Sequence, residues 1–170
     1  MFKKINVPKT ENYFILKNEV LSDRITWFYH PSTTVDGKDF PFFSHIVVRS
    51  PGNPNIYPTV GSTYSSLCNM VLTEIFNQNE IEVNCILRIN FNMTLPVISD
   101  KKTSYPHYDH KFDHKNLLIY FSDSDGDTVV CEEKEYRNTP KEDSAIIFEG
   151  KHYHHLPTYG RRVVLICTFI

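Results

Sequence analysis

Long apolar runs are missing from this sequence, and no stretch approaches the roughly 18 apolar residues that a membrane-spanning helix needs. The first residues, MFKKI, are charged but are not followed by an apolar stretch, so we expect neither a signal peptide nor a membrane partner. An excess of one charge is also missing, because 18 lysines and arginines face 20 aspartates and glutamates. Proteins that bind polyanions usually carry a basic excess, so nucleic acid is not an expected partner.

Cysteine and glycine are scarce as well. The chain has 4 cysteines and no CxxC pair, which is too few for a disulfide scaffold. We therefore expect reduced thiols and a cytoplasmic protein. If a phage encodes the protein, this cytoplasm is that of the host. It has 6 glycines and little alanine, but 12 phenylalanines and 10 tyrosines. Because aromatic residues favour strands and alanine favours helices, this composition predicts a mainly β protein.

The hydrophobic pattern divides the chain into two parts. The second part is rich in predicted strands, and the first part is expected to support it. A helix is predicted over about residues 63–77, where apolar residues recur at helical spacing, whereas residues 22–29 fit either a strand or a short helix. Strands are expected at residues 42–49, 83–91, 117–121, 128–131, 145–148 and 163–170. Many short strands at fairly regular intervals suggest a sandwich, jelly roll or barrel. We therefore expect one domain over residues 1–170, with residues 1–80 supporting a core over residues 81–170.

Six of the 8 histidines fall in two short windows, PHYDHKFDH at 106–114 and HYHH at 152–155. On an extended segment residues i and i+2 project to the same face, so His107 and Asp109 place an imidazole beside a carboxylate. A second imidazole from a later strand, His154 or His155, would complete a two-histidine, one-carboxylate triad. Such a triad leaves open positions and suits Fe(II) that must bind a co-substrate and oxygen.

The remaining histidines of these two windows are not expected to bind the metal. His110 and His114 are spaced i, i+4 and could form a helical metal pair, but we expect them in a loop at the mouth of the cavity. His152 is expected at the surface. An arginine at the start of the last strand, Arg161 or Arg162, could grip a carboxylate through two parallel hydrogen bonds.

The segments 106–130 and 143–169 resemble the 2-oxoglutarate- and Fe(II)-dependent dioxygenases, in particular small phage and bacterial members related to prolyl hydroxylases. This sequence and the family share the same order of motifs. A His-x-Asp is followed by a strand that ends in tyrosine, a Gly-x-Thr strand, a phenylalanine followed by a histidine, and a late arginine. The resemblance covers about residues 85–169. It implies a mainly β, α+β fold with a double-stranded β-helix core, a jelly roll of the cupin type. It also implies a hydroxylase that uses O2, Fe(II) and 2-oxoglutarate, with ascorbate as an optional cofactor, and releases succinate and CO2.

The resemblance also implies roles for single residues. His107 and Asp109 match the first two iron ligands. His154 matches the distal ligand because it lies six residues after Phe148, as in similar small members, and His155 is its rival.

The resemblance also implies which residues bind 2-oxoglutarate. Arg162 matches the arginine that binds the distal carboxylate of 2-oxoglutarate, and Tyr120 matches a strand tyrosine that contacts the same carboxylate. Arg161 competes with Arg162, because a slip of one residue exchanges the side chains that face inward. Two departures affect this half: the loop from His154 to Arg162 is short by about one residue, and Val164 stands where some members have serine.

The sequence leaves the substrate open between a peptide and a small molecule, and peptidyl-proline is favoured only by the resemblance. Two other functions stay in view. One is a jelly-roll binding or structural module with a metal site and no catalysis. The other is a zinc hydrolase, because His107-x-Asp109-His110 matches the tail of a His-x-His-x-Asp-His signature, although Tyr105 stands where the first histidine would be.

Overall fold

The computed structural model describes residues 1–33, 39–51 and 57–170. Its elements are β1 (Phe2–Ile5), α1 (Glu11–Leu21), β2 (Phe28–His30), β3 (Phe42–Arg49), β4 (Thr59–Val60), α2 (Ser65–Gln78), β5 (Ile86–Thr94), β6 (Lys115–Tyr120), β7 (Thr128–Cys131), β8 (Glu135–Asn138), β9 (Ser144–Glu149), β10 (Lys151–His154) and β11 (Arg162–Phe169). Within the described ranges, neither helix has the length and apolar character needed to cross a bilayer.

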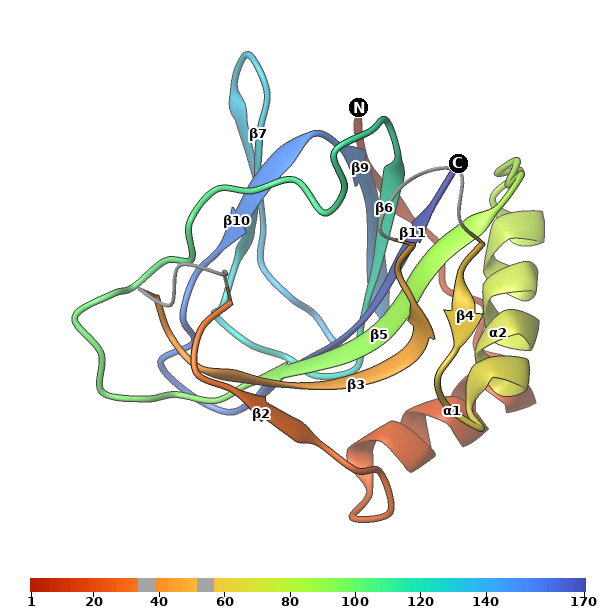
Figure 1. Ribbon diagram of the computed structural model, residues 1–170, viewed down its shortest axis with the longest axis horizontal. Helices are drawn as coiled ribbons and strands as arrows, with labels where there is room; N and C mark the ends of the chain where they lie inside the picture. Colours follow the sequence, from red (N-terminus) through yellow and green to blue (C-terminus); the bar gives the residue numbers. More distant parts are fainter. Residues whose placement is uncertain (34–38, 52–56) are drawn as a thin grey trace.

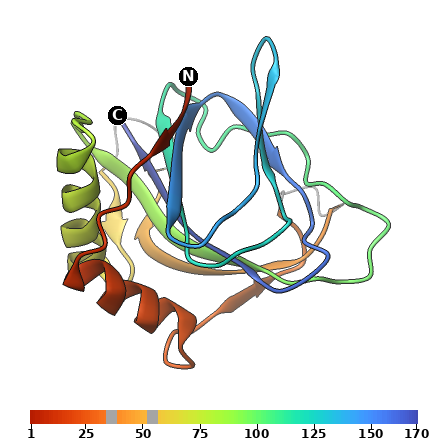
Figure 2. The same cartoon turned by 180° about the vertical axis from the view of Figure 1, so that it is seen from behind.

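The strands form two antiparallel sheets that face each other (Figures 1 and 2). The large sheet has the order β1-β9-β6-β11-β5-β3-β2, with β4 paired to β3, and the small sheet has the order β10-β7-β8. The large sheet curves, and β10 and β7 lie across from it. The arrangement confirms the predicted jelly-roll core.

Both helices cover the outer face of the large sheet (Figure 1). Because side chains alternate along a strand, Leu117 and Ile119 of β6 join the core beneath the helices, whereas Leu118 and Tyr120 join a second apolar cluster between the sheets. β6 is therefore buried on both faces, which explains its uninterrupted apolar sequence. Full burial of one such aliphatic side chain stabilises the fold by about 1.5–3 kcal/mol.

The predicted elements are largely confirmed. The strands expected at 42–49 and 128–131 have those bounds, and the helix expected at 63–77 is α2. The strands expected at 83–91, 117–121, 145–148 and 163–170 correspond to β5, β6, β9 and β11, with ends shifted by a few residues. Of residues 22–29, only the last two belong to a strand, β2.

The pattern analysis missed α1, β1, β4, β8 and β10. Helix α1 is short, but the spacing of its buried residues Tyr13, Leu16, Lys17 and Val20 is helical, and Thr10 caps it by accepting a hydrogen bond from the Tyr13 amide. Strand β10 has no aliphatic residue, because its inward face carries imidazoles. A search for apolar alternation cannot find such a strand.

A partly buried ionic contact ties α1 to the loop that precedes β9. The Tyr13 hydroxyl and the Lys17 ammonium donate to Oδ1 of Asp143 at 2.7 and 2.6 Å. Burial by itself would raise the pKa of Asp143, but the hydrogen bonds from Lys17 and Tyr13 hold it below its usual value. Asp143 has a φ of 59°, a left-handed conformation that aspartate and asparagine tolerate better than most residues.

Replacing Asp143 with asparagine should therefore lower the free energy of unfolding by about 1–3 kcal/mol, because Lys17 loses the less exposed of its two charged acceptors and keeps only Glu142. Since the folded-state pKa of Asp143 is depressed, its contribution is present above the unfolded value of about 3.9 and is lost as the pH falls through the folded value. Urea unfolding of wild type and Asp143→Asn between pH 3 and pH 7 measures both effects. Equal unfolding midpoints at pH 7 would contradict this role for the contact.

Arg24→Ala is the matched control. It also removes an ion pair to a residue of α1, between Nη2 of Arg24 and Oε1 of Glu19 at 2.6 Å, but the Arg24 side chain is 64% exposed. Exposed pairs contribute less than about 1 kcal/mol, so this variant should be nearly as stable as wild type.

Candidate metal centre and carboxylate site

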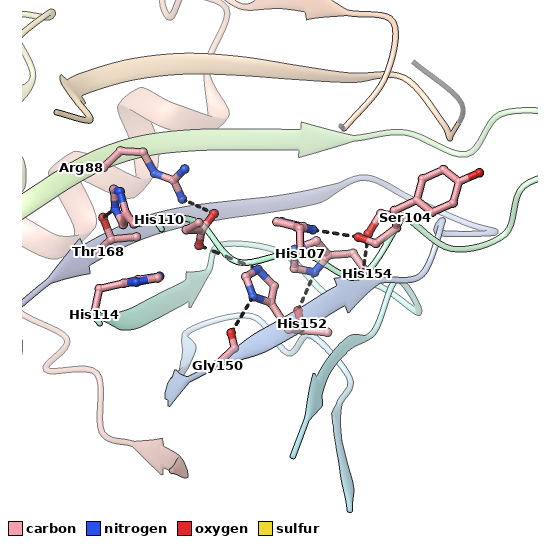
Figure 3. A network of polar contacts seen from close by, with 12 residues as sticks. Arg88, Ser104, His107, His110, His114, Gly150, His152, His154 and Thr168 are labelled. Carbon is pink, nitrogen blue, oxygen red and sulfur yellow. Dashed lines mark hydrogen bonds and ion pairs between the residues drawn. The ribbon is translucent and has the colours of Figure 1, made fainter. Parts of the chain in front are cut away.

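Backbone pairing brings the two histidine windows together. The amide of His107 donates to the carbonyl of His152 at 2.9 Å, and the amide of His152 donates to the carbonyl of His107 at 3.0 Å. The amide of Ser104 likewise donates to the carbonyl of His154 at 2.8 Å. Residues 103–107 therefore run antiparallel along β10, as a further short partner of the small sheet (Figure 3).

Three imidazoles gather at this pairing. One ring nitrogen from each of His107, His152 and His154 lies within 4.8 Å of the other two. His152 and His154 share a face of β10 because they are two residues apart. His155 lies on the opposite face, with Nε2 3.4 Å from Nη2 of Arg137. Between the two candidates that the sequence offered, the structure brings His154 to the cluster and leaves His155 outside it.

His152, which we expected at the surface, is buried with 2% of its area exposed. That expectation was wrong because β10 was not recognised as a strand. Once residues 151–154 are extended, the i, i+2 rule that joins His107 to Asp109 also joins His152 to His154.

Two of the imidazoles have the same hydrogen-bonding arrangement. Nδ1 of His107 lies 2.9 Å from the carbonyl of Tyr105, and Nδ1 of His152 lies 3.5 Å from the carbonyl of Gly150. A carbonyl oxygen only accepts, so the proton of each neutral ring is on Nδ1 and the lone pair is on Nε2. Burial lowers the pKa of His152 to about 4, which keeps this ring neutral at physiological pH. Such rings are ready to bind a metal through Nε2.

Asp109 borders the imidazole cluster. Its Oδ1 forms an ion pair with Nη2 of Arg88 at 2.8 Å, and its Oδ2 lies 3.8 Å from Nε2 of His152. Although burial by itself would raise the pKa of Asp109, the positive charge of Arg88 lowers it below its usual range, so the carboxylate is ionised. Oδ2 and Nε2 thus present two lone pairs across a gap longer than a hydrogen bond, an arrangement that a cation between them would stabilise.

A second charged group lies deeper in the same space. Arg162 is 3% exposed, and its Nε and Nη2 donate to the Gly126 carbonyl at 3.0 Å and the Thr128 hydroxyl at 2.9 Å. The Tyr120 hydroxyl also donates to Thr128, at 2.9 Å. In the part of the chain that the structure describes, no carboxylate forms an ion pair with Arg162. A buried guanidinium with only neutral acceptors is suited to bind an anion.

The neighbouring Arg161 lies elsewhere. It is exposed at the surface, and its Nη2 donates to the carbonyl of Leu21 at 3.3 Å. The first residue of β11 is Arg162, whose side chain enters the space between the sheets. Of the two arginines that the sequence offered, Arg162 is therefore the one that faces the imidazoles.

His107, Asp109, His152, His154 and Arg162 line one cavity of about 640 Å³ between the sheets. Its opposite wall is polar and comes from β3 and β5, including Ser44, Asn90 and Asn92. Two atoms at this wall, Nε of Arg88 and Oδ1 of Asn90, are buried without a hydrogen-bonding partner among the described residues. The cavity therefore offers metal donors, an anion site and free polar atoms for one polar ligand or several.

His110 and His114, which we expected at the mouth, do not line this cavity. Each is 8% exposed in the segment before β6, and Nε2 of His110 lies 2.8 Å from the Thr168 hydroxyl. The helical pair is not formed either, because this segment contains no helix. Their rings pack edge to face with centroids 4.7 Å apart, and they support the segment that carries His107 and Asp109.

Sequence reasoning missed Arg88 as well as His152. Arg88 is a lone charged residue within a strand whose neighbours Leu87 and Ile89 are buried. A charge inside such a strand must face a cavity or a partner, and this signal could have identified it.

No protein-family model and no curated protein matches the sequence. Solved structures do match. A 2OG-Fe(II) oxygenase family oxidoreductase from Burkholderia pseudomallei has a TM-score of 0.69 and 14% identity, over 95% of this chain and 82% of that one. A prolyl hydroxylase from Trichoplax adhaerens, in complex with a hypoxia inducible factor peptide fragment, has a TM-score of 0.67 and 10% identity, over 99% and 83%.

The epimerase SnoN, in complex with Fe3+, alpha ketoglutarate and nogalamycin RO, has a TM-score of 0.63 and 9% identity, over 99% of this chain and 78% of that one. At these identities the likeness concerns the fold. The chain has the fold of the 2-oxoglutarate- and Fe(II)-dependent oxygenases, as the order of its sequence motifs implied.

Proposed function

We propose that this protein is an Fe(II)- and 2-oxoglutarate-dependent oxygenase that hydroxylates a C–H bond of a peptide or small molecule. The observation that carries the proposal is the pairing, in one cavity, of a metal-donor cluster with the buried cation Arg162. A co-substrate that has a metal-chelating end and a distal carboxylate needs both. The shared fold supports the same conclusion without specifying the reaction.

The donors fit Fe(II). His107, Asp109 and an imidazole of β10, His154 or its neighbour His152, supply two nitrogens and one oxygen, the set that leaves positions open for other ligands. When bound, Fe(II) and 2-oxoglutarate together with O2 would supply the oxidising chemistry, in which one oxygen atom of O2 converts the C–H bond to an alcohol, the other enters succinate, and CO2 is released.

The other residues of the cavity have binding and positioning roles in this proposal. Arg162 binds the distal carboxylate of 2-oxoglutarate, and the Thr128 hydroxyl, which Tyr120 orients, stands beside it. Arg88 positions Asp109 by holding Oδ1, which directs Oδ2 toward His152. The burial of these groups excludes water from the site and strengthens their electrostatic interactions.

The wall formed by β3 and β5 is the proposed substrate side, because it lines the same cavity as the metal donors and carries Oδ1 of Asn90, which has no hydrogen-bonding partner among the described residues. Since β1, β3 and β5 belong to the same sheet as β11, which carries Arg162, and residues of β3 and β5 line one cavity with the imidazoles of β10, we infer that residues 1–170 act as one catalytic domain. The 4 free cysteines support our expectation of a cytoplasmic protein.

The first prediction concerns the metal and co-substrate together. Anaerobic titration with Fe(II) and 2-oxoglutarate should produce a weak visible absorbance band that requires both components, because 2-oxoglutarate chelates the metal. Asp109→Ala should abolish the band, and His155→Ala, which alters the opposite face of β10, should retain it. Tight zinc binding to the three imidazoles with no such band in wild type would favour a zinc site instead.

The second prediction concerns the carboxylate anchor. Arg162→Met keeps the bulk of the side chain but removes its charge, so the affinity for 2-oxoglutarate should fall about 10- to 100-fold, the loss expected for charged hydrogen bonds. The affinity for Fe(II) should change far less. Isothermal titration calorimetry with Fe(II) and with 2-oxoglutarate measures the two affinities separately, and Arg161→Met is the control. An equal loss from both arginine variants would contradict the assignment of Arg162.

The third prediction concerns Gly126, which leaves room for the arginine. A Cβ at this position would lie 3.1 Å from Cδ of Arg162 and 3.0 Å from the carbonyl of His155. Gly126→Ala should therefore displace the guanidinium and weaken 2-oxoglutarate binding about tenfold, while Fe(II) still binds. If 2-oxoglutarate binds Gly126→Ala as tightly as wild type, Arg162 is not held at its binding position by this contact.

A further inference from the structure

His154 touches both halves of the cavity. One of its ring nitrogens belongs to the donor cluster with His107 and His152. Its Nδ1 lies 3.3 Å from the Thr128 hydroxyl oxygen and 3.4 Å from Nη2 of Arg162. The ring therefore stands between the metal donors and the cation that we assign to the distal carboxylate.

The hydrogen bonds of Thr128 determine what Nδ1 of His154 does. The Thr128 oxygen accepts from the Tyr120 hydroxyl and from Nη2 of Arg162, both at 2.9 Å, which uses its two lone pairs. The hydroxyl hydrogen is then free to be donated to Nδ1 of His154 at 3.3 Å. Nη2 of Arg162 carries a second hydrogen that points to the same nitrogen. Nδ1 of His154 is thus an acceptor for two donors.

A neutral imidazole has one ring nitrogen with a lone pair, and in His154 this lone pair serves Thr128 and Arg162. The ring proton is therefore on Nε2, which leaves no lone pair for a metal. His107 and His152 have the opposite arrangement, because their Nδ1 atoms face backbone carbonyls and their Nε2 atoms form no hydrogen bond with the described residues. His154 can bind a metal or cap Arg162, but it cannot do both at once.

We propose, on the basis of the function proposed above, that His152 is the metal ligand of β10 and that His154 caps Arg162 until the distal carboxylate of 2-oxoglutarate displaces it. The cap gives the buried guanidinium a neutral acceptor in place of an anion. A carboxylate replaces it because its pair with the guanidinium is ionised on both sides and can form two parallel hydrogen bonds, whereas the ring nitrogen is a single neutral acceptor. The affinity for 2-oxoglutarate is then reduced by the cost of moving His154.

Metal and co-substrate binding test this assignment in the whole protein. With Co(II) as the probe, His152→Ala should lose at least about 100-fold in affinity, whereas His154→Ala should stay within about threefold of wild type. On the Co(II)-loaded protein, His154→Ala should bind 2-oxoglutarate about tenfold more tightly, because no cap has to move. His155→Ala is the matched control, one residue beyond β10, and should leave both affinities unchanged.

The opposite pattern would overturn the proposal. A large loss of Co(II) affinity in His154→Ala would make His154 a metal ligand, whether or not His152→Ala also loses affinity. A 2-oxoglutarate affinity that is unchanged or lower in His154→Ala would show that His154 does not cap Arg162.

Nitrogen NMR of the metal-free protein gives a readout that depends on neither iron nor variants that could misfold. The His154 ring should carry its proton on Nε2, and the His107 and His152 rings should carry theirs on Nδ1. Glutarate, a dicarboxylate of the same length as 2-oxoglutarate, should shift the His154 signals in wild type but not in Arg162→Met. A His154 ring protonated on Nδ1 would refute the cap even if the absorbance band confirms the oxygenase. A missing band with the expected tautomers would instead refute the oxygenase alone.

Discussion

The site depends on the reciprocal backbone hydrogen bonds between His107 and His152. These two bonds fix the register of residues 103–107 against β10, and the register decides which side chains meet. Because neighbouring residues of a strand point to opposite faces, a slip of one residue would turn the imidazoles of β10 away from the cavity. The long segment between β5 and β6 therefore contributes to the site through its pairing, although it contains only isolated bridges.

Two buried arginines divide the cavity into electrically different halves. Arg88 has a resident partner, because Asp109 lies 2.8 Å away, and this pair keeps the carboxylate ionised beside the imidazoles. Arg162 has only neutral acceptors among the described residues. Burial of a cation without an anion is costly, so the second half of the cavity is suited to a ligand that brings its own carboxylate.

Much of the fold could be predicted because its strands are apolar. β6 and β11 are buried on both faces and are visible as uninterrupted hydrophobic runs, and the helical spacing within α2 is equally clear. β10 and β8 could not be found in this way, because one carries imidazoles toward the cavity and the other is largely exposed. The polar strand that apolar patterns overlook is here the strand that supplies the site.

The site could be predicted where its residues are close in the sequence. His107 and Asp109 follow from local alternation, and Arg162 follows from its place at the start of an apolar strand. The sequence does not show which imidazole of β10 binds the metal, because His152 and His154 lie on the same face of the strand. Only the hydrogen-bonding partners of each Nδ1 distinguish them. Tyr105 and Gly150 offer backbone carbonyls to His107 and His152, whereas Thr128 and Arg162 offer hydrogens to His154. The second set of partners comes from β7 and β11, so the role proposed for His154 follows from tertiary contacts and not from its spacing along the chain.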